Sequence, residues 1–122
     1  MASMLYEDVV MLTGTNLDRQ TIDYMIAAAD GEISAYITAA GAYMRPEWEP
    51  LIRKASEYLI VAKILTRYRL DGRREVSTLE YSDRGDLTGA IDWYTRRAWK
   101  ILDDILASYK TAFGVRITGF ED

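Results

Sequence analysis

Apolar residues recur at three- and four-residue steps along most of this chain, and that spacing predicts amphipathic helices. The longest regular example in the first half runs from about Asp18 to Ala40, where acidic and other polar residues fall between the apolar steps. Gly41 follows as a natural C-terminal cap. The predicted apolar stripe of this helix comprises Ile22, Ile26, Ala29, Ile33, Ile37 and Ala40.

A short helix is predicted before it, from Tyr6 to Leu12. Glu7 and Asp8 suit its first turn, because the N-terminal end of a helix carries partial positive charge. Thr13 and Gly14 form a stop signal. Its small apolar face comprises Val9, Val10 and Leu12.

A third helix is predicted to begin around Pro50, since proline is well tolerated in the first turn. It should end near Leu70, because Asp71-Gly72 is a strong turn signal. Apolar residues surround this segment nearly all the way round, so we expect it at the centre of a bundle. Its main stripe is Leu51, Ala55, Tyr58, Leu59, Ala62 and Leu65, widened by Ile60, Val61 and Ile64.

The last predicted helix is the longest and runs from about Asp86 to Phe113. It would extend roughly 40 Å, against roughly 30 Å for the third helix. We therefore expect that something outside a compact monomer covers the excess length. Its predicted apolar face comprises Leu87, Ala90, Ile91, Tyr94, Ala98, Ile101, Ile105, Tyr109 and Phe113.

Two segments lack a helical period: residues 71–86, a loop or arm, and residues 114–122, a tail. The loop is long for a compact domain; it holds either a short extended arm or a merely solvated connection. The tail alternates apolar with polar residues, as a short strand does, and we expect it to dock on something. The apolar residues are Val76, Leu79 and Tyr81 in the loop and Val115, Ile117 and Phe120 in the tail.

Together these elements predict one all-α domain spanning residues 1–122. It is a bundle of three longer helices plus a short N-terminal helix, with an extended excursion between the last two helices and an extended tail. A chain of 122 residues is long enough for one self-sufficient core. No apolar run approaches the roughly 20 residues of a membrane span, and no targeting segment is visible, so we expect a protein without a membrane partner.

Composition removes several kinds of chemistry. The chain has no His and no Cys, so disulfides, thiolate or imidazole metal sites and nucleophiles built on these residues are excluded. The nearest approach to a carboxylate cluster is Asp103-Asp104 with Asp83 and Asp86. Neighbouring positions on a helix point about 100° apart, which favours solvated acids over a metal site. We therefore predict no metal, no cofactor and no enzymatic activity.

Charge is unevenly distributed around a net value of −4. Residues 1–50 contain eight acids and two bases, whereas residues 51–74 contain two acids and seven bases. Such a chain could pair with copies of itself, acid to base, or could simply have a solvated polar surface. The acidic balance argues against nucleic acid as the principal ligand.

Aromatic residues are numerous, with nine Tyr, three Trp and two Phe. Trp93 and Trp99 fall beside the apolar stripe of the last helix. Large amphipathic rings at the margin of a core are common at protein interfaces, but they also simply widen cores. Both interpretations remain open from the sequence.

Four features follow one another along the chain. They are Leu5-Tyr6-Glu7-Asp8-Val9-Val10, the Ile-Ala-Ala-Ala-Asp-Gly-Glu-Ile-Ser-Ala-Tyr-Ile run at residues 26–37, the proline-marked helix with Ala55 and Ala62, and the polar excursion ending in Tyr81-Ser82. This order resembles the small head-tail connector, adaptor or head completion proteins of tailed bacteriophages and prophages.

The resemblance implies a structural virion subunit that assembles as a ring, twelvefold, below the portal protein and extends the DNA channel from head to tail. It implies contacts with neighbouring subunits, with the portal and with a further connector or tail protein, and DNA that passes through without sequence-specific binding. The protein would reside at the head-tail junction of the virion and in the host cytoplasm during assembly. The interface residues expected on this basis, together with the two tryptophans, are Val76, Leu79, Tyr81, Trp93, Trp99, Val115, Ile117 and Phe120.

Two other functions compete with this one. A small helical regulatory or protein-binding module could act through the aromatic-rich surface. A carboxylate-dependent Mg²⁺ enzyme using Asp103 or Asp104 is the third and weakest hypothesis.

Overall fold

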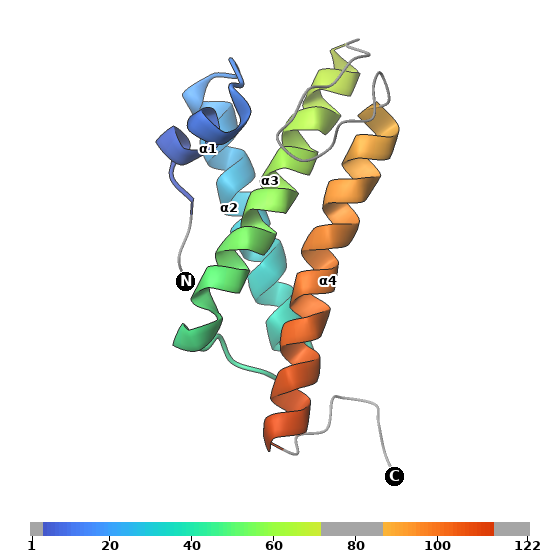
Figure 1. Ribbon diagram of the computed structural model, residues 1–122. Helices are drawn as coiled ribbons and strands as arrows, with labels where there is room; N and C mark the ends of the chain where they lie inside the picture. Colours follow the sequence, from blue (N-terminus) through green and yellow to red (C-terminus); the bar gives the residue numbers. More distant parts are fainter. Residues whose placement is uncertain (1–3, 72–86, 114–122) are drawn as a thin grey trace.

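The computed structural model describes residues 4–71 and 87–113, and 85% of these residues are helical (Figure 1). No strand occurs within those two ranges, so the all-α prediction is confirmed. The predicted excursion beyond Asp71 and the tail at 114–122 lie outside the described residues. The elements are α1 (Tyr6–Thr13), α2 (Arg19–Ala39), the 3₁₀ helix η1 (Pro46–Trp48), α3 (Glu49–Leu70) and α4 (Leu87–Phe113).

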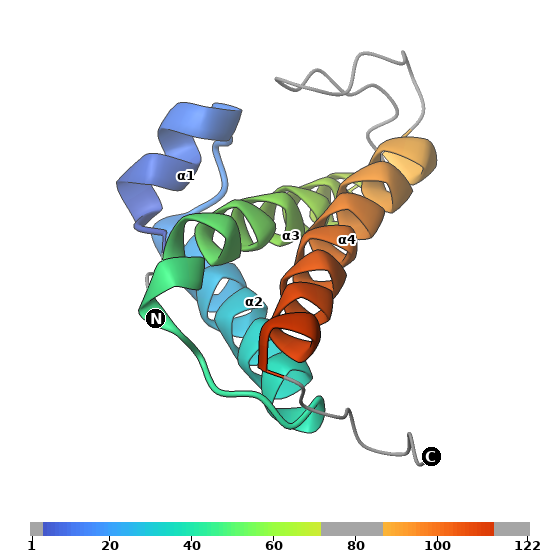
Figure 2. The same ribbon diagram turned by 60° about the horizontal axis from the view of Figure 1, so that its bottom comes forward.

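Helix α3 occupies the middle of the bundle, as the sequence predicts. It contacts α1, α2, η1 and, most extensively, α4, whereas α2 and α4 touch each other over a much shorter stretch. Figure 1 shows α2 starting beside α1 and crossing behind α3, and Figure 2 shows that the C-terminal ends of α2 and α4 lie next to each other. None of the helices in the described ranges combines the length and apolarity that crossing a membrane requires.

The connection between α1 and α2 is fixed by glycine and threonine. Gly14 caps α1 at φ +67°, a conformation that favours glycine, and its N–H donates to the Val10 carbonyl at 2.8 Å. Thr15 is buried and accepts a hydrogen bond of 2.8 Å from the Tyr68 hydroxyl of α3. Asp18 is the N-cap of α2 and does not lie in its first turn, which corrects the predicted start by one residue.

A short 3₁₀ helix, η1, directly precedes α3, and the sequence did not predict it. Residues 46–48, which precede the predicted start of the third helix, form η1, and Trp48 is buried with its ring edge-on to Tyr109 of α4 at a centroid distance of 5.6 Å. Pro50 lies in the first turn of α3, as predicted. Thus η1 covers part of the C-terminal end of α4, where the sequence alone left the excess helix length without a partner.

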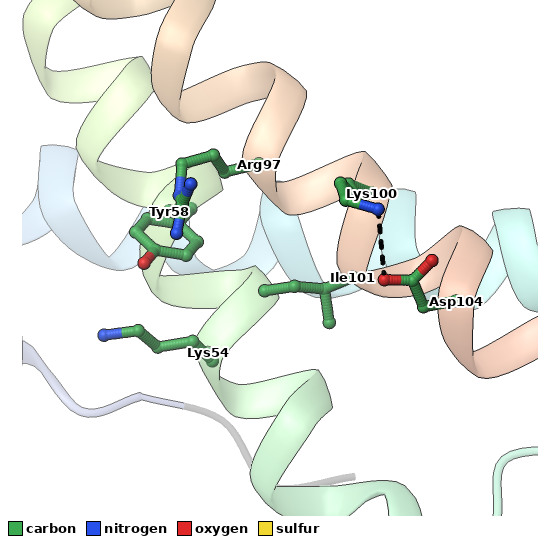
Figure 3. A pocket seen from close by; sticks show the side chains of 6 residues that line it. All are labelled: Lys54, Tyr58, Arg97, Lys100, Ile101 and Asp104. Atoms are coloured by element: carbon green, nitrogen blue, oxygen red, sulfur yellow. Dashed lines mark hydrogen bonds and ion pairs between the residues drawn. The ribbon is translucent and has the colours of Figure 1, made fainter.

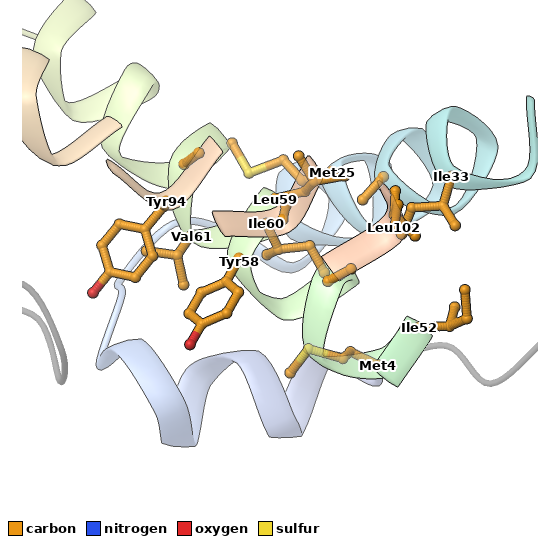
Figure 4. Close-up of a cluster of buried hydrophobic side chains, with 14 of the residues drawn as sticks. Met4, Met25, Ile33, Ile52, Tyr58, Leu59, Ile60, Val61, Tyr94 and Leu102 are labelled. Atoms are coloured by element: carbon orange, nitrogen blue, oxygen red, sulfur yellow. The ribbon is translucent and has the colours of Figure 1, made fainter. Parts of the chain in front are cut away.

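The buried residues confirm the apolar stripe predicted for α2, but on α3 they differ from the predicted stripe at one position. Along α2 the predicted positions are buried apart from Ala40, which is half-buried, and Met25 joins them. On α3 the prediction that Leu51 belongs to the main stripe is wrong: Leu51 is 50% exposed, whereas Ile52 is 1% exposed (Figure 4). Packing of α3 against its neighbouring helices sets its rotation about its own axis, and at this rotation Ile52 faces the core while Leu51 does not.

On α4 the prediction missed Leu102, which is completely buried. Ile91, Ile101 and Tyr109, predicted as core residues, pack only partly against the core. The buried line therefore passes through Ala98 and Leu102. The side chain of Phe113 lies outside those described.

Candidate functional site

The structure describes only two of the predicted interface residues, Trp93 and Trp99. Both lie on α4, and both are half-buried. Since they are six positions apart on a helix, they lie on opposite flanks of the buried line, and the fold does not bring them together. The other six lie outside the described residues: Val76, Leu79, Tyr81, Val115, Ile117 and Phe120.

Trp99 lies on the α2 flank of α4. Its ring packs on that of Tyr36 at a centroid distance of 5.0 Å, and the Tyr36 hydroxyl donates a hydrogen bond to Asp103. This hydrogen bond, with a smaller contribution from burial, raises the pKa of Tyr36 above its ordinary value of 10.0. The ring contact and the hydrogen bond of Tyr36 thus join α2 to α4, which have few other contacts with each other.

Trp93 lies on the other flank, at the contact with α3. Its ring is edge-on to Tyr94 at 4.8 Å and to Tyr58 at 6.2 Å. The guanidinium of Arg97 lies over this group, 4.7 Å from the centre of the Trp93 ring and 5.7 Å from that of Tyr58. Cations at such distances are attracted to the faces of aromatic rings. Arg97 is therefore held against two rings from two helices.

An open hollow of about 330 Å³ lies beside these rings, between α3 and α4. Figure 3 shows that Lys54 and Tyr58 line it from α3, while Arg97, Lys100, Ile101 and Asp104 line it from α4. We call this feature the cationic hollow, because three of the six residues are basic and one is acidic.

Local helix geometry explains how the sequence builds the cationic hollow. On α4, Lys100 and Ile101 lie three and four positions after Arg97 and four and three before Asp104, so the four residues share a face. The same spacing brings Lys54 within 5.0 Å of the Tyr58 ring centre and Lys100 within 3.5 Å of Asp104. Tyr58, which lines the hollow from α3, is only 3% exposed, so little of its ring reaches solvent.

The three bases of the cationic hollow differ in their acidic partners. Lys54 forms an ion pair with Glu57 at 3.1 Å, and Lys100 with Asp104 at 3.5 Å. Arg97 is exposed, and within the part of the chain that the structure describes no carboxylate lies within 4.0 Å of its nitrogens. Its N–H groups are therefore available to an anion from outside.

Asp103 and Asp104, the nearest approach to a carboxylate cluster in the sequence, do not converge on one point. Asp103 accepts the hydrogen bond from Tyr36, whereas Asp104 pairs with Lys100 on the other flank. Across residues 4–71 and 87–113 no three acidic residues come close enough together to hold a metal ion. Asp83 and Asp86 lie outside the described residues.

Part of the uneven charge along the sequence is paired inside the fold. Asp8 of α1 meets Arg53 of α3 at 2.8 Å, and Glu32 of α2 meets Lys63 of α3 at 2.7 Å. These pairs join the acidic first part of the chain to the basic third helix. They pair acids with bases within one copy, whereas the sequence suggested pairing between copies, which stays a prediction.

The basic end of α3 is also engaged. Arg67 pairs with Asp71 at 3.5 Å, and the Arg69 guanidinium donates to the Thr88 hydroxyl of α4 at 3.3 Å. Both contacts secure the end of the helix where α3 leads out of the described residues.

Sequence reasoning missed Arg97 and Lys54 as site residues. A signal for each was present: Trp93 precedes Arg97 by four positions, and Lys54 precedes Tyr58 by four, which places a cation near a ring on each helix. That the two helices bring these pairs to one hollow depends on their packing, which the sequence pattern does not specify.

Comparison with known proteins adds no relative: no protein-family model matches the chain, and no curated protein or solved structure matches it either.

Proposed function

We propose that this chain is a non-enzymatic structural subunit of a tailed phage or prophage. In this proposal it forms a ring below the portal that joins head to tail and extends the DNA channel. The observation that carries it is the order of elements: a short helix, a long helix containing residues 26–37, a central proline-started helix and a longer final helix. This order is the one on which the resemblance to head-tail connectors rests.

Exposed apolar side chains support an assembling subunit. Met11 is 86% exposed and Leu70 76% exposed. Both lie toward the end of the bundle where the Tyr68–Thr15 hydrogen bond joins α3 to the α1–α2 connection. Leu70 is also the last residue of α3, so it adjoins the segment for which subunit contacts are proposed. Contacts there would remove these side chains from water.

The ring is tested by native mass spectrometry and negative-stain electron microscopy over a wide range of chain concentration, with and without the portal protein of the same virion. We expect closed rings, twelvefold, when the portal is present. Portal is included because a ring of weakly interacting subunits needs a template to raise their effective concentration. A chain that stays monomeric in all these samples would contradict the proposal.

Matched variants locate the interface. The triple substitution Val76→Ser, Leu79→Ser and Tyr81→Ser should abolish ring formation, while the melting temperature stays within a few degrees of the parent value. Substituting their polar neighbours, Thr78→Ala with Ser82→Ala, is the control and should leave rings intact. Equal loss of rings in both variants would show that the apolar side chains are not the contacts.

A further inference from the structure

We propose that the cationic hollow between α3 and α4 binds an acidic peptide segment of another protein, with Arg97 receiving its carboxylate. This site goes beyond the ring proposed above and stands or falls independently of it. Its occupant is a short stretch in which a glutamate or aspartate adjoins an apolar side chain.

Arg97 is preorganised for a carboxylate. Its contacts with the Trp93 and Tyr58 rings restrict the guanidinium, while Arg97 as a residue remains exposed. A planar fork of this kind matches the two oxygens of a carboxylate, and less side-chain freedom is lost on binding when the guanidinium is already held. Among the bases of the hollow it is also the one with no acidic partner in the described chain.

The walls of the hollow define the rest of the ligand. Ile101 offers apolar contact beside the arginine, and a volume of about 330 Å³ lies at the small end of the range for ligand sites. This space suits one or two side chains of a peptide. Lys54 and Lys100 at the rim would raise the rate of encounter with an acidic segment.

Two other occupants fit less well. Nucleic acid is bound by a row of cations that follows successive phosphates, whereas Asp104 and Glu57 flank the bases here. A second copy of the described fold offers few spare acids: Asp8, Asp23 and Glu32 each pair with a base of their own chain. As far as the described residues are concerned, charge complementarity therefore favours an acidic segment of a different protein.

The test titrates the full chain with a capped hexapeptide that carries two central glutamates flanked by phenylalanines, and with the same peptide carrying glutamines. Binding is followed through the NMR signals of the Arg97 Nε–H and the Trp93 indole N–H. We expect both signals to shift with the glutamate peptide, and the glutamine peptide to bind at least tenfold more weakly. Raising the salt concentration should weaken the binding of the glutamate peptide, because salt screens charges near the surface.

Variants assign the effect to the hollow. Arg97→Ala should lower the affinity for the glutamate peptide at least fivefold. Arg97→Lys should also lower this affinity, because lysine lacks the planar fork of the guanidinium. Arg96→Ala is the matched control: Arg96 is an adjacent, exposed arginine that pairs with Asp92 at 2.9 Å, outside the hollow. It should leave the affinity unchanged. Circular dichroism of each variant verifies that the helices are intact.

Four results would overturn the proposal. They are equal binding of the two peptides, equal loss in Arg96→Ala and Arg97→Ala, a DNA duplex that shifts the same signals at lower concentration than the peptide, and shifts that appear with chain concentration alone. The third would assign the hollow to phosphate groups, and the fourth to a second copy of the chain.

Discussion

Helices α3 and α4 are the most extensively paired elements of the fold, yet they are buried in different ways. On α3 every residue from Tyr58 to Ala62 is buried, so no side of that stretch faces water. On α4 burial follows one line, and the rest of the helix carries charge. The buried positions of α4 are Leu87, Ala90, Tyr94, Ala98, Leu102, Ile105 and Leu106.

The difference follows from the number of neighbours. Helix α3 is covered by α1, α2, α4 and η1, whereas α4 packs mainly against α3. A continuous apolar run therefore marks a helix enclosed by others, and a single apolar stripe marks one that covers a side of the bundle. The open sides of α4 are the places where the rings and bases of the cationic hollow can lie.

The largest contrast is expected from placing a charge on each helix. Ala55→Glu on α3, at a completely buried site, should lower the free energy of unfolding by about 3–5 kcal/mol because the carboxylate has no partner there. Ala107→Glu on α4 is exposed and should change it by less than about 0.5 kcal/mol. Urea unfolding followed by circular dichroism measures both. Similar losses in the two variants would mean that α4 is covered as fully as α3.

Truncating one leucine on each helix is expected to give the next largest contrast. Leu102→Ala removes a completely buried side chain of α4 and should cost about 2–5 kcal/mol through lost burial and the cavity that remains. Leu51→Ala, at 50% exposure on α3, should cost less than about 0.5 kcal/mol. The same unfolding measurement decides the case. A larger cost at Leu51 would restore the stripe that the sequence predicted for α3.

These two leucines show where sequence reasoning succeeds and where it stops. The hydropathy period and the positions of proline and glycine predicted each of the four α-helices found in residues 4–71 and 87–113. Their ends lie at most one or two residues from those observed, because these signals act within a helix. Which residue of an adjacent apolar pair turns inward depends on the rotation of each helix about its axis. Packing against other helices sets that rotation, so Ile52 replaced Leu51 and Leu102 joined the core.

The cationic hollow was harder to predict for the same reason. Lys54 and Arg97 are far apart in sequence and lie on separate helices, and only the α3–α4 contact brings them to one place. The pairing of Glu32 with Lys63 likewise required the three-dimensional arrangement. For Trp93 and Trp99 the sequence placed both correctly beside the apolar stripe, but it did not indicate that they have separate partners on opposite flanks.

A smaller effect is expected at the hydrogen bond between α2 and α4. Tyr36→Phe removes the hydroxyl that donates to Asp103 and should lower the free energy of unfolding by about 0.5–1.5 kcal/mol at neutral pH. The fold raises the pKa of Tyr36, so this stabilisation is fully present below the ordinary pKa of 10.0 and is lost as the pH rises through the folded value. Parent and variant should thus converge in stability above pH 10. A constant difference across that range would show that Tyr36 does not act through its proton.

The smallest contrast concerns one ion pair on each helix. Lys63 of α3 has a side chain 26% exposed and lies 2.7 Å from Glu32, whereas Arg96 of α4 is 79% exposed and lies 2.9 Å from Asp92. Lys63→Ala should cost up to about 1 kcal/mol, since its aliphatic part is also covered, and Arg96→Ala about 0.5 kcal/mol or less. Measuring the free energy of unfolding in low and high salt separates the contribution of charge from that of packing. The loss caused by Arg96→Ala should vanish in high salt, whereas much of the loss caused by Lys63→Ala should persist. If high salt removed both losses equally, Lys63 would stabilise the fold through its charge alone. The burial that distinguishes α3 from α4 would then stabilise the fold only through the apolar side chains of α3.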